Sequence, residues 1–558
     1  MLKSVLFIDR LVVGSVFLLA TIFYAAIFRY AINVPYMDDY AYINSVHQIF
    51  APGQSFSEIV RLLVEQHNDH RILLSRLLVV ADYWVEGQVN YRTLVLLGSL
   101  SIAGLTWAVY HLFRKAGLPV WMLLPVALLL FQPSYQDDVW SVICLLQHTL
   151  TLLLILLVFQ LLTRPETWSQ AGALVLGWLI IYSNSNGFFM WVAVLVLLTM
   201  TRRWRWLTAW LLTGSVLTYL YFGVNYTFLA QSSLESVIRH PGWVLKSVIS
   251  FAGSALYFDQ RRWLLLPGQW VVLGAGTLVL LSIVASWLRG LARPRWLTPT
   301  ITPFLGLGFV LIATGLAAAL VRSDGSLMII ERYQLFAVWC LIVVYALLIL
   351  QLTQRWRKRV GWVSLGLASW FWLNAWLYYG PQLSERYNRQ IAEAVALKHY
   401  GYSVVSQPFG RDVNWRNEWN QAMKQGLYKM PDLPEIAGIE AAMKTAPHLD
   451  STIHFATAIK WIPPLSTDGL YLEQDTLLTP DFLYLQSAAD WYVMPRQRLV
   501  KPVLGPFLPD KGIKSSLLPV MLKPGSYRLG WIRRTKTGWF STLTRQEIQV
   551  KNKPLPLP

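Results

Sequence analysis

The chain has 558 residues, of which 55% are hydrophobic and only 14% are charged. Its apolar residues come in blocks too long and too unbroken for a soluble domain, so the composition indicates an integral membrane protein. The net charge of +18 does not indicate nucleic acid, because much of the excess lies in short turns between apolar blocks, where anionic lipid headgroups are the natural partner.

Eleven apolar segments approach the roughly 17–25 residues that a helix needs to cross the hydrocarbon. In the first of them, Leu11 to Phe28 carries no charge and no small-residue cleavage site follows, so we interpret it as an uncleaved span. The segments lie near 7–28, 92–112, 119–132, 145–162, 170–184, 187–201, 206–223, 269–288, 300–321, 334–353 and 361–379.

Lysine and arginine in the connections predict the orientation. With the N-terminus in the cytoplasm, every predicted cytoplasmic turn is basic, as the positive-inside rule requires. Residues 243–258 are apolar but short, and a full span there would invert every later basic loop, so we predict an interfacial or re-entrant helix. The protein is then a multi-pass protein of the bacterial inner membrane, with everything after Tyr379 in the periplasm. The basic turns contain Arg114-Lys115, Arg164, Arg202 to Arg205, Arg289 with Arg293 and Arg295, and Arg355 to Arg359.

Composition changes after Tyr379, which divides the chain into a transmembrane module, 1–380, and a periplasmic domain, 381–558. The fold class we expect is a polytopic α-helical membrane protein with a mixed α/β or β-rich C-terminal domain. In that domain, residues 385–399 are predicted to form an amphipathic helix, and short segments rich in aromatic and aliphatic residues are predicted to form strands. These strand segments are 481–486, 491–494, 526–531 and 546–550.

The first outer loop, 29–90, is long enough to be functional. Its apolar-periodic stretches, 42–50, 57–64 and 72–85, are predicted to lie flat on the membrane. Cys144 and Cys340, both inside or at the edge of spans, support neither a disulfide framework nor a thiolate metal site, so we expect two inert buried thiols.

Asp38 and Asp39 follow the outer end of the first span by only a few positions. A carboxylate at that boundary can accept a hydrogen bond from an acceptor hydroxyl and remove its proton. The alternative is a solvated acidic turn that caps the next helix, because aspartate is a good N-cap.

The same loop carries a dense cluster of titratable groups, Glu65 to Arg71. If this stretch is helical, His67, His70 and Arg71 lie close to one face, which could bind a phosphate, orient a carboxylate or hold a metal. A metal is the weakest of these, because the spacing matches no well-specified site. A solvated interfacial helix is the competing interpretation.

Polar residues also gather at other outer turns. Acidic, amide and aromatic side chains commonly bind sugar rings, so their convergence favours a polyhydroxylated ligand, although short turns simply prefer Asn, Ser and Gly. The residues predicted to contact sugar or acceptor are Asp69, Asp137, Asp138, Trp140, Gln147, Asn184 and Asn186.

Cationic side chains on that side could neutralise a lipid-phosphate leaving group. Arg332 opens the tenth span beside apolar sequence, where a charge is costly and usually partnered; a local ion pair or an interfacial anchor is the alternative. The donor or phosphate-binding residues we predict are Arg71, His67, His70, Arg332, Tyr333 and Arg322, with Arg261-Arg262 as further cationic candidates.

These features resemble the GT-C glycosyltransferases, a superfamily that includes protein O-mannosyltransferases, aminoarabinose transferases of lipid A and the catalytic subunit of oligosaccharyltransferase. The resemblance covers about residues 1–380 and rests on the architecture and Asp38-Asp39. In addition, Gln66 to Arg71 and Arg332-Tyr333 are similar to motifs of bacterial members and of phage-type O-antigen glucosyltransferases.

The resemblance implies a polyprenyl-phosphate sugar donor, inversion at the anomeric carbon, and Asp38 or Asp39 as the general base, with Asp38 preferred. The Trp-Trp-Asp motif of oligosaccharyltransferase is absent, which favours a glycan or lipid-linked saccharide as acceptor over peptide asparagine. The chain also has no Gly-rich nucleotide signature, as expected for a lipid-linked donor. We predict no metal site and no cofactor, with a divalent cation left open.

Three other functions compete with this one. A transporter or flippase would also be polytopic and basic inside, but it normally needs polar groups near the membrane midplane. An O-antigen polymerase or ligase would use a lipid-diphosphate donor. A glycan-binding scaffold predicts that Asp38 and Asp39 are dispensable.

Overall fold

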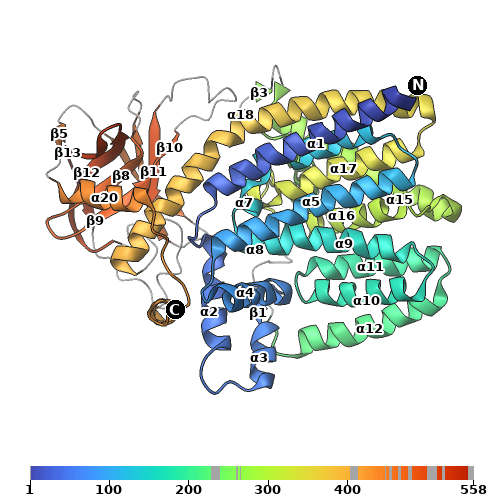
Figure 1. Ribbon diagram of the computed structural model, residues 1–558, viewed down its shortest axis with the longest axis horizontal. Helices are drawn as coiled ribbons and strands as arrows, with labels where there is room; N and C mark the ends of the chain where they lie inside the picture. Colours follow the sequence, from blue (N-terminus) through green and yellow to red (C-terminus); the bar gives the residue numbers. More distant parts are fainter. Residues whose placement is uncertain are drawn as a thin grey trace. The chain divides into compact units, whose positions relative to one another are not determined.

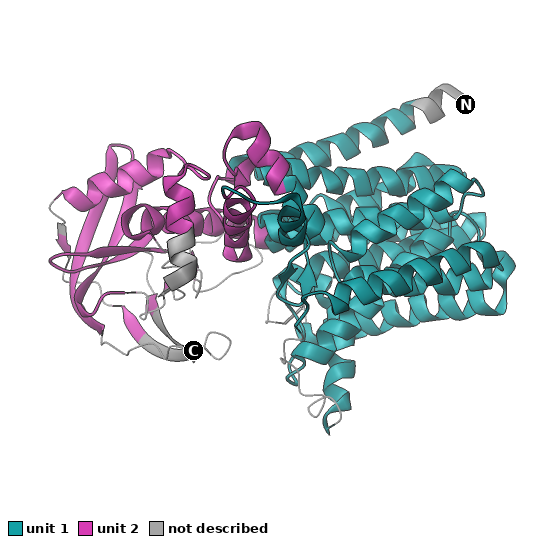
Figure 2. Ribbon diagram, turned by 90° about the horizontal axis from the view of Figure 1, so that it is seen from below, with its two compact units in different colours: residues 1–29, 52–78, 94–376 teal, residues 30–51, 79–93, 377–558 magenta. Residues whose placement is uncertain are grey.

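The computed structural model describes most of the chain. The described residues are 2–227, 239–258, 262–263, 266–401, 413–445, 448–450, 455–462, 467–474, 480–498, 512–517 and 522–550. The chain forms two compact units, shown in Figure 2: unit 1 comprises Met1–Arg29, Pro52–Leu78 and Leu94–Trp376, and unit 2 comprises Tyr30–Ala51, Val79–Thr93 and Leu377–Pro558. Unit 2 therefore combines the C-terminal part with two segments of the first outer loop.

Helices make up most of unit 1 (Figure 1). Each of the eleven apolar segments predicted from the sequence is wholly or mainly helical. The helices that begin or lie in this unit are α1 (Leu2–Tyr30), α3 (Phe56–Leu63), α4 (Leu73–Glu86), α5 (Tyr91–Lys115), α6 (Leu124–Leu130), α7 (Gln136–Val139), α8 (Val142–Cys144), α9 (Leu150–Leu162), α10 (Thr167–Ile181), α11 (Asn186–Met200), α12 (Trp204–Gly223), α14 (Pro241–Gly253), α15 (Gly268–Ala292), α16 (Thr302–Arg322), α17 (Gln334–Gln351) and α18 (Gln354–Tyr400).

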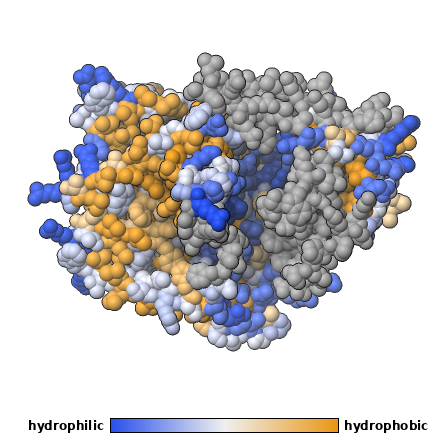
Figure 3. All heavy atoms as spheres, turned by 180° about the vertical axis from the view of Figure 1, so that it is seen from behind, coloured by the Kyte–Doolittle hydropathy of each residue, from blue (hydrophilic) through white to orange (hydrophobic). Residues whose placement is uncertain are grey.

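Among the described residues, six helical segments are long and apolar enough to cross a membrane: Asp9–Tyr30, Tyr91–Lys115, Val142–Leu162, Gly268–Ala292, Thr302–Arg322 and Glu331–Gln351. Two further apolar helices, α10 and α11, are shorter. The polytopic helical membrane fold is thus confirmed, and the count of eleven crossings stays a prediction. Figure 3 shows an apolar band on the side of the helical unit that faces the viewer, as hydrocarbon contact requires.

Short irregular elements lie between these helices or at their ends. Leu145–Thr149 is a π-helix between α8 and α9, and 3₁₀ turns form at Met37–Asp39, Val120–Leu123, Pro133–Tyr135, Ser254–Leu256, Pro294–Trp296 and Glu331–Tyr333. A π-helical turn inside an α-helix is uncommon and frequently marks a functional position.

The stretch that carries His67, His70 and Arg71 is not helical, so the shared helix face considered for these residues does not form. This stretch forms a hairpin, β1 (Gln66–His67) and β2 (His70–Arg71), in which His67 pairs with His70. Asn68 adopts a left-handed backbone, φ +50°, which asparagine tolerates better than most residues. The Gln66 side chain holds the turn by donating to the carbonyl of Asn68 at 2.6 Å.

Unit 2 contains the predicted β-rich region as two sheets. The five-stranded sheet has the order β5-β13-β12-β8-β9, and the four-stranded sheet has the order β10-β11-β7-β6. The predicted strands correspond to β8, β9, β12 and β13. The strands are β5 (His448–Asp450), β6 (Ala456–Ile462), β7 (Thr467–Gln474), β8 (Phe482–Gln486), β9 (Trp491–Pro495), β10 (Gln497–Arg498), β11 (Ile513–Leu517), β12 (Gly525–Thr535) and β13 (Gly538–Val550).

One core of unit 2 joins segments that are distant in sequence. Ile32 and Val34 from the first loop pack with Ile391 and Val395 of α18 and with Ile439 of α20 (Pro434–Lys444). The first loop also contributes α2 (Tyr40–Ile49), which packs against α19 (Val413–Lys424). The residues just before the acidic pair are therefore held by the C-terminal part of the chain.

Candidate functional site

The two adjacent aspartates have different environments. Asp39 is buried, and its Oδ2 accepts a hydrogen bond from the backbone N–H of Tyr36 at 3.2 Å. Asp38 is only partly buried. Asp39 is the N-cap residue of α2 but makes no side-chain cap hydrogen bond to that helix; its carboxylate instead closes the 3₁₀ turn Met37–Asp39, and Asp38 is the more exposed of the two aspartates.

The residue before the pair adopts an uncommon backbone conformation. Met37 has φ +50° although it is not glycine. A left-handed non-glycine residue costs of the order of 1–3 kcal/mol and persists only where its surroundings impose it. Such positions cluster at functional sites, which supports the acidic turn as a candidate site.

A buried carboxylate that we did not predict lies beside this turn. Glu393 of α18 is buried and accepts a hydrogen bond from the Tyr40 hydroxyl. Burial and the neighbouring carboxylate raise the pKa of Tyr40 well above its usual value, so the hydroxyl stays protonated and donates. The sequence signal was a single glutamate flanked by apolar residues within 385–399.

Aromatic rings surround the acidic turn within unit 2. Tyr40 lies 5.1 Å from the ring of Trp419, which lies 5.4 Å from Tyr428. The Arg386 guanidinium stands 3.9 Å from the centre of the Tyr36 ring, a cation–π contact. These contacts fix the backbone on both sides of Asp38.

In unit 1, Arg71 is a buried structural anchor. Its guanidinium donates to the carbonyls of Tyr221 at 2.8 Å, Val224 at 2.5 Å and Val64. The guanidinium also stands 5.2 Å from the Tyr221 ring. These contacts tie the hairpin to the end of α12, so much of the donor capacity of Arg71 is already used within the protein.

The two histidines of the hairpin differ in their contacts. Burial lowers the pKa of His67 to about 3, with the charges of His70 and Arg76 adding to the effect, so His67 is neutral near pH 7. It can hydrogen-bond a phosphate but brings it no positive charge. His70 Nε2 lies 2.9 Å from Oε1 of Gln147, which links the hairpin to the π-helix.

The second polar cluster is centred on Asp138 and His148. Asp138 is fully buried, and its Oδ1 lies 2.5 Å from Nδ1 of His148. Asn184 donates to the carbonyl of Gln147 at 3.1 Å. The structure therefore brings together Asp138, Gln147, Asn184 and His70, all of which the sequence singled out, and adds His148.

Two predicted cations belong to this region. Arg332 lies in the 3₁₀ turn Glu331–Tyr333, which precedes α17, and Arg322 is the last residue of α16. Arg322 also stands 5.5 Å from the ring of Tyr333, and the turn that carries Arg332 and Tyr333 packs against α7. This part of unit 1 therefore combines positive charge with buried polar groups.

The other predicted residues lie around these clusters. Trp140 is buried, Asp137 is partly buried, and Asp69 is exposed, with its backbone carbonyl bonded to Tyr226. The backbone N–H of Asn186 bonds to Asn184 at the start of α11, which fits the turn-residue alternative for this pair. Arg261 and the side chain of Arg262 lie outside the described residues.

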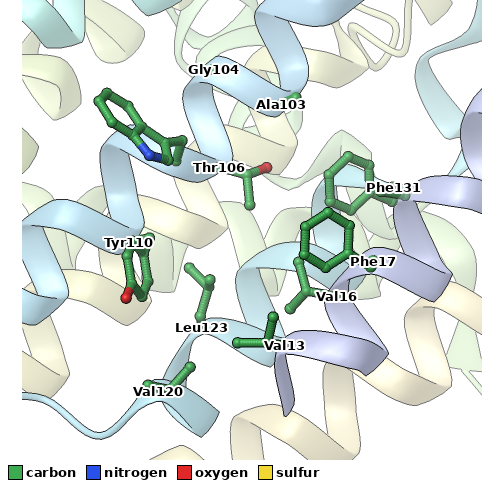
Figure 4. A pocket seen from close by; sticks show the side chains of 12 residues that line it. Val13, Val16, Phe17, Ala103, Gly104, Thr106, Tyr110, Val120, Leu123 and Phe131 are labelled. Carbon is green, nitrogen blue, oxygen red and sulfur yellow. The ribbon is translucent and has the colours of Figure 1, made fainter. Parts of the chain in front are cut away.

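An apolar pocket beside the first span is lined by none of these polar residues. A cavity of about 620 Å³ opens between α1 and α5. Phe17, Ala103, Trp107 and Leu123 are among its apolar lining residues, as Figure 4 shows in part. Its lining has no charged side chain, so it suits hydrocarbon and not a reacting group.

The fold and these clusters define a polytopic membrane protein with buried polar groups among its helices. No protein-family model matches the chain, and no curated protein matches it. A solved structure, that of ArnT from Cupriavidus metallidurans bound to undecaprenyl phosphate, is similar at 16% sequence identity and a TM-score of 0.35, over 79% of this chain and 83% of that one.

Proposed function

We propose that the protein is a membrane glycosyltransferase of the GT-C type. It transfers a sugar from a polyprenyl-phosphate carrier to a glycan or lipid-linked saccharide on the periplasmic face of the bacterial inner membrane. The observation that carries the proposal is the division of roles in the acidic pair: buried Asp39 holds the turn, and partly buried Asp38 follows a left-handed Met37 just beyond the first span.

In the proposed reaction Asp38 is the general base. Its carboxylate takes the proton of the acceptor hydroxyl while the acceptor oxygen forms a bond to the anomeric carbon of the donor. The bond between that carbon and the phosphate oxygen breaks, and the polyprenyl phosphate leaves with its electron pair. Attack from the face opposite the leaving group inverts the anomeric configuration.

The leaving phosphate gains negative charge, which requires cationic partners. We assign this role to Arg332, whose turn packs against α7, and to Arg322, which stands 5.5 Å from the centre of the Tyr333 ring. His67, His70 and Tyr333 are proposed as further hydrogen-bond donors to the donor headgroup. Arg71 is a weaker candidate, because its guanidinium donates to three carbonyl groups.

We assign the sugar and acceptor to the remaining polar residues. Asp138, Gln147 and Asn184 lie in one hydrogen-bonded region of unit 1, and Asp69, Asp137, Trp140 and Asn186 flank it in sequence. The C-terminal domain is proposed to position the acceptor.

The first test is transfer of a radiolabelled sugar from polyprenyl phosphate by purified protein, comparing wild type with Asp38→Asn and Asp39→Asn. We expect Asp38→Asn to lose about 10²–10⁴-fold in rate without losing stability. Asp39→Asn should mainly lower stability, by about 1 kcal/mol, because a neutral amide oxygen accepts the hydrogen bond from the Tyr36 N–H less strongly than a carboxylate does. Equal transfer by all three proteins would remove the acidic pair from the mechanism.

One observation favours a transporter as the second candidate. The pair Asp138–His148 is a buried acid–histidine contact at the start of the membrane-spanning segment 142–162, the kind of group that proton-coupled transporters use. Movement of a lipid-linked sugar across vesicles, lost in His148→Gln but retained in Asp38→Asn, would support transport over transfer.

A further inference from the structure

A mixed set of metal-binding side chains lies together in unit 1. Asp138, Cys144 and His148 each offer one ligand atom, and these atoms all lie within 4.8 Å of one another. Asp138 is fully buried, and Cys144 and His148 are partly buried. We propose that these three residues form a zinc site. The site goes beyond the proposed glycosyl transfer, and it gives Asp138 the role of metal ligand in place of the sugar contact assigned to it above.

The chemistry of the ligands favours zinc. A thiolate, an imidazole and a carboxylate are the three side-chain ligands that Zn²⁺ takes in proteins. Magnesium and calcium prefer oxygen ligands alone, so the sulfur of Cys144 argues against them. Three protein ligands leave the fourth tetrahedral position for a water molecule or a substrate oxygen.

The geometry needs only small side-chain movements. Zinc–ligand bonds of about 2.0–2.3 Å place tetrahedral ligand atoms about 3.3–3.7 Å apart. The Asp138 Oδ1 and His148 Nδ1 atoms, now 2.5 Å apart, would separate slightly as the metal replaces the proton between them. The remaining ligand atoms, which lie within 4.8 Å of one another, need to approach by up to about 1.3 Å to reach these separations.

The π-helix places two of the ligands. Cys144 directly precedes Leu145–Thr149, and His148 lies within it, four residues later. Side chains four residues apart lie on the same face of a helix, so both ligands point in one direction. Asp138 comes from the preceding short helix α7, and zinc would therefore cross-link α7 to the helix that continues into α9.

Charge balance also permits the metal. Ionised Asp138 and Cys144 carry two negative charges, and neutral His148 carries none, so bound Zn²⁺ makes the site neutral. On binding, the Cys144 thiol releases its proton to solvent, and the His148 nitrogen that binds the metal gives up any proton it carries.

Metal analysis of the purified full-length protein tests the proposal. We expect one zinc ion per chain in wild type. Cys144→Ala and His148→Ala should weaken zinc binding by about 100-fold or more, because each removes one of three ligands. Cobalt replacing zinc should give a sulfur-to-metal charge-transfer band that Cys144→Ala abolishes.

The second cysteine of the chain supplies the matched control. Cys340 is buried in α17 and is not part of the cluster, so Cys340→Ala should keep both the zinc and the cobalt band. Cys144→His, which restores a ligand, should recover zinc without the sulfur band. Wild-type protein that binds no zinc, or a cobalt band that survives Cys144→Ala, would reduce the cluster to an Asp138–His148 hydrogen bond.

A negative result in the metal-binding experiment does not bear on the sugar-transfer experiment, and the reverse also holds. Zinc binding is measured without any sugar donor, so its absence would leave the role of Asp38 untouched. Conversely, transfer lost in Asp38→Asn says nothing about Asp138, Cys144 and His148.

Discussion

Asp38 and Asp39 are adjacent in sequence, yet packing separates their roles. The Asp39 carboxylate points back to the N–H of Tyr36, and the hydroxyl of Tyr91 donates to its backbone carbonyl at 3.0 Å. Asp39 therefore stabilises the local fold through its side chain and its backbone carbonyl. The neighbouring position keeps partial solvent access, which a general base requires in order to meet its substrate.

Asp82 in α4 gives a residue-scale prediction about pH. Burial raises the pKa of its carboxyl to about 7, although the backbone N–H of Asn90 donates to it at 2.7 Å. Its pKa is higher in the folded than in the unfolded state, so the folded state binds more protons between about pH 4 and 7. Stability from this group is therefore present at low pH and is lost as pH rises through that window.

Asp82→Asn should remove this dependence. We expect the thermal midpoint of wild type in detergent to fall more between pH 5 and pH 8 than that of Asp82→Asn, which cannot ionise. The exposed residue Asp432 provides the control, because Asp432→Asn removes one charge without removing a buried one. If the thermal midpoints of wild type and Asp82→Asn changed in parallel with pH, burial would not raise the pKa of the Asp82 carboxyl.

At the scale of elements, the hairpin of residues 66–71 shows how a local pattern misleads. Two histidines and an arginine at helical spacing predicted one polar face. The turn at Asn68 and the contacts of Arg71 with the end of α12 select a hairpin instead. The local sequence could not decide this, because the partner of Arg71 is 150 residues away.

The contact between α14 and α15 is unusually close. A Cβ built on Gly276 would lie 1.9 Å from the carbonyl oxygen of Ile249, and one on Gly253 would lie 2.0 Å from that of Val272. Two helix backbones can approach this closely only where both lack side chains. The short apolar segment 243–258 thus forms a helix that packs directly on its neighbour.

Gly276→Ala should lower the free energy of unfolding by about 1–3 kcal/mol, because the added methyl group has to push α14 away from α15. Gly274→Ala on the same helix is the matched control, since nothing lies within 4 Å of its Cβ position. Thermal unfolding of both variants in detergent measures the difference. Equal midpoints for the two variants would contradict the close packing.

At the scale of the whole molecule, two segments of the first loop belong to the same compact unit as the C-terminal part of the chain. The first loop contributes Tyr30–Ala51 and Val79–Thr93 to unit 2. Tyr428 donates to the carbonyl of Asn33 at 2.6 Å, and Gln390 donates to that of Val34 at 3.0 Å. A truncation at Pro381 would remove both contacts, so loss of transfer in it would not by itself show an acceptor-binding role.

Membrane orientation gives the whole-molecule prediction. Alkaline phosphatase fused after Tyr400 should be active, because the basic turns place that position outside the cytoplasm. Fusions after Arg202 or Arg295 should be inactive, and green fluorescent protein at the same three positions should give the opposite result. An active phosphatase fusion after Arg295 would mean that α14 crosses the membrane and that the span count is wrong.

The sequence by itself determined the membrane class, the helical segments and the C-terminal strands. These follow from hydrophobic length and residue periodicity, which are local properties of the chain. The tertiary structure alone decided which polar groups meet. Tyr40 and Glu393, which form a hydrogen bond, are 353 residues apart in sequence. The burial of Asp39 likewise depends on the packing of distant segments around it. Neither feature can be inferred from local sequence, because each arises only when those segments pack together.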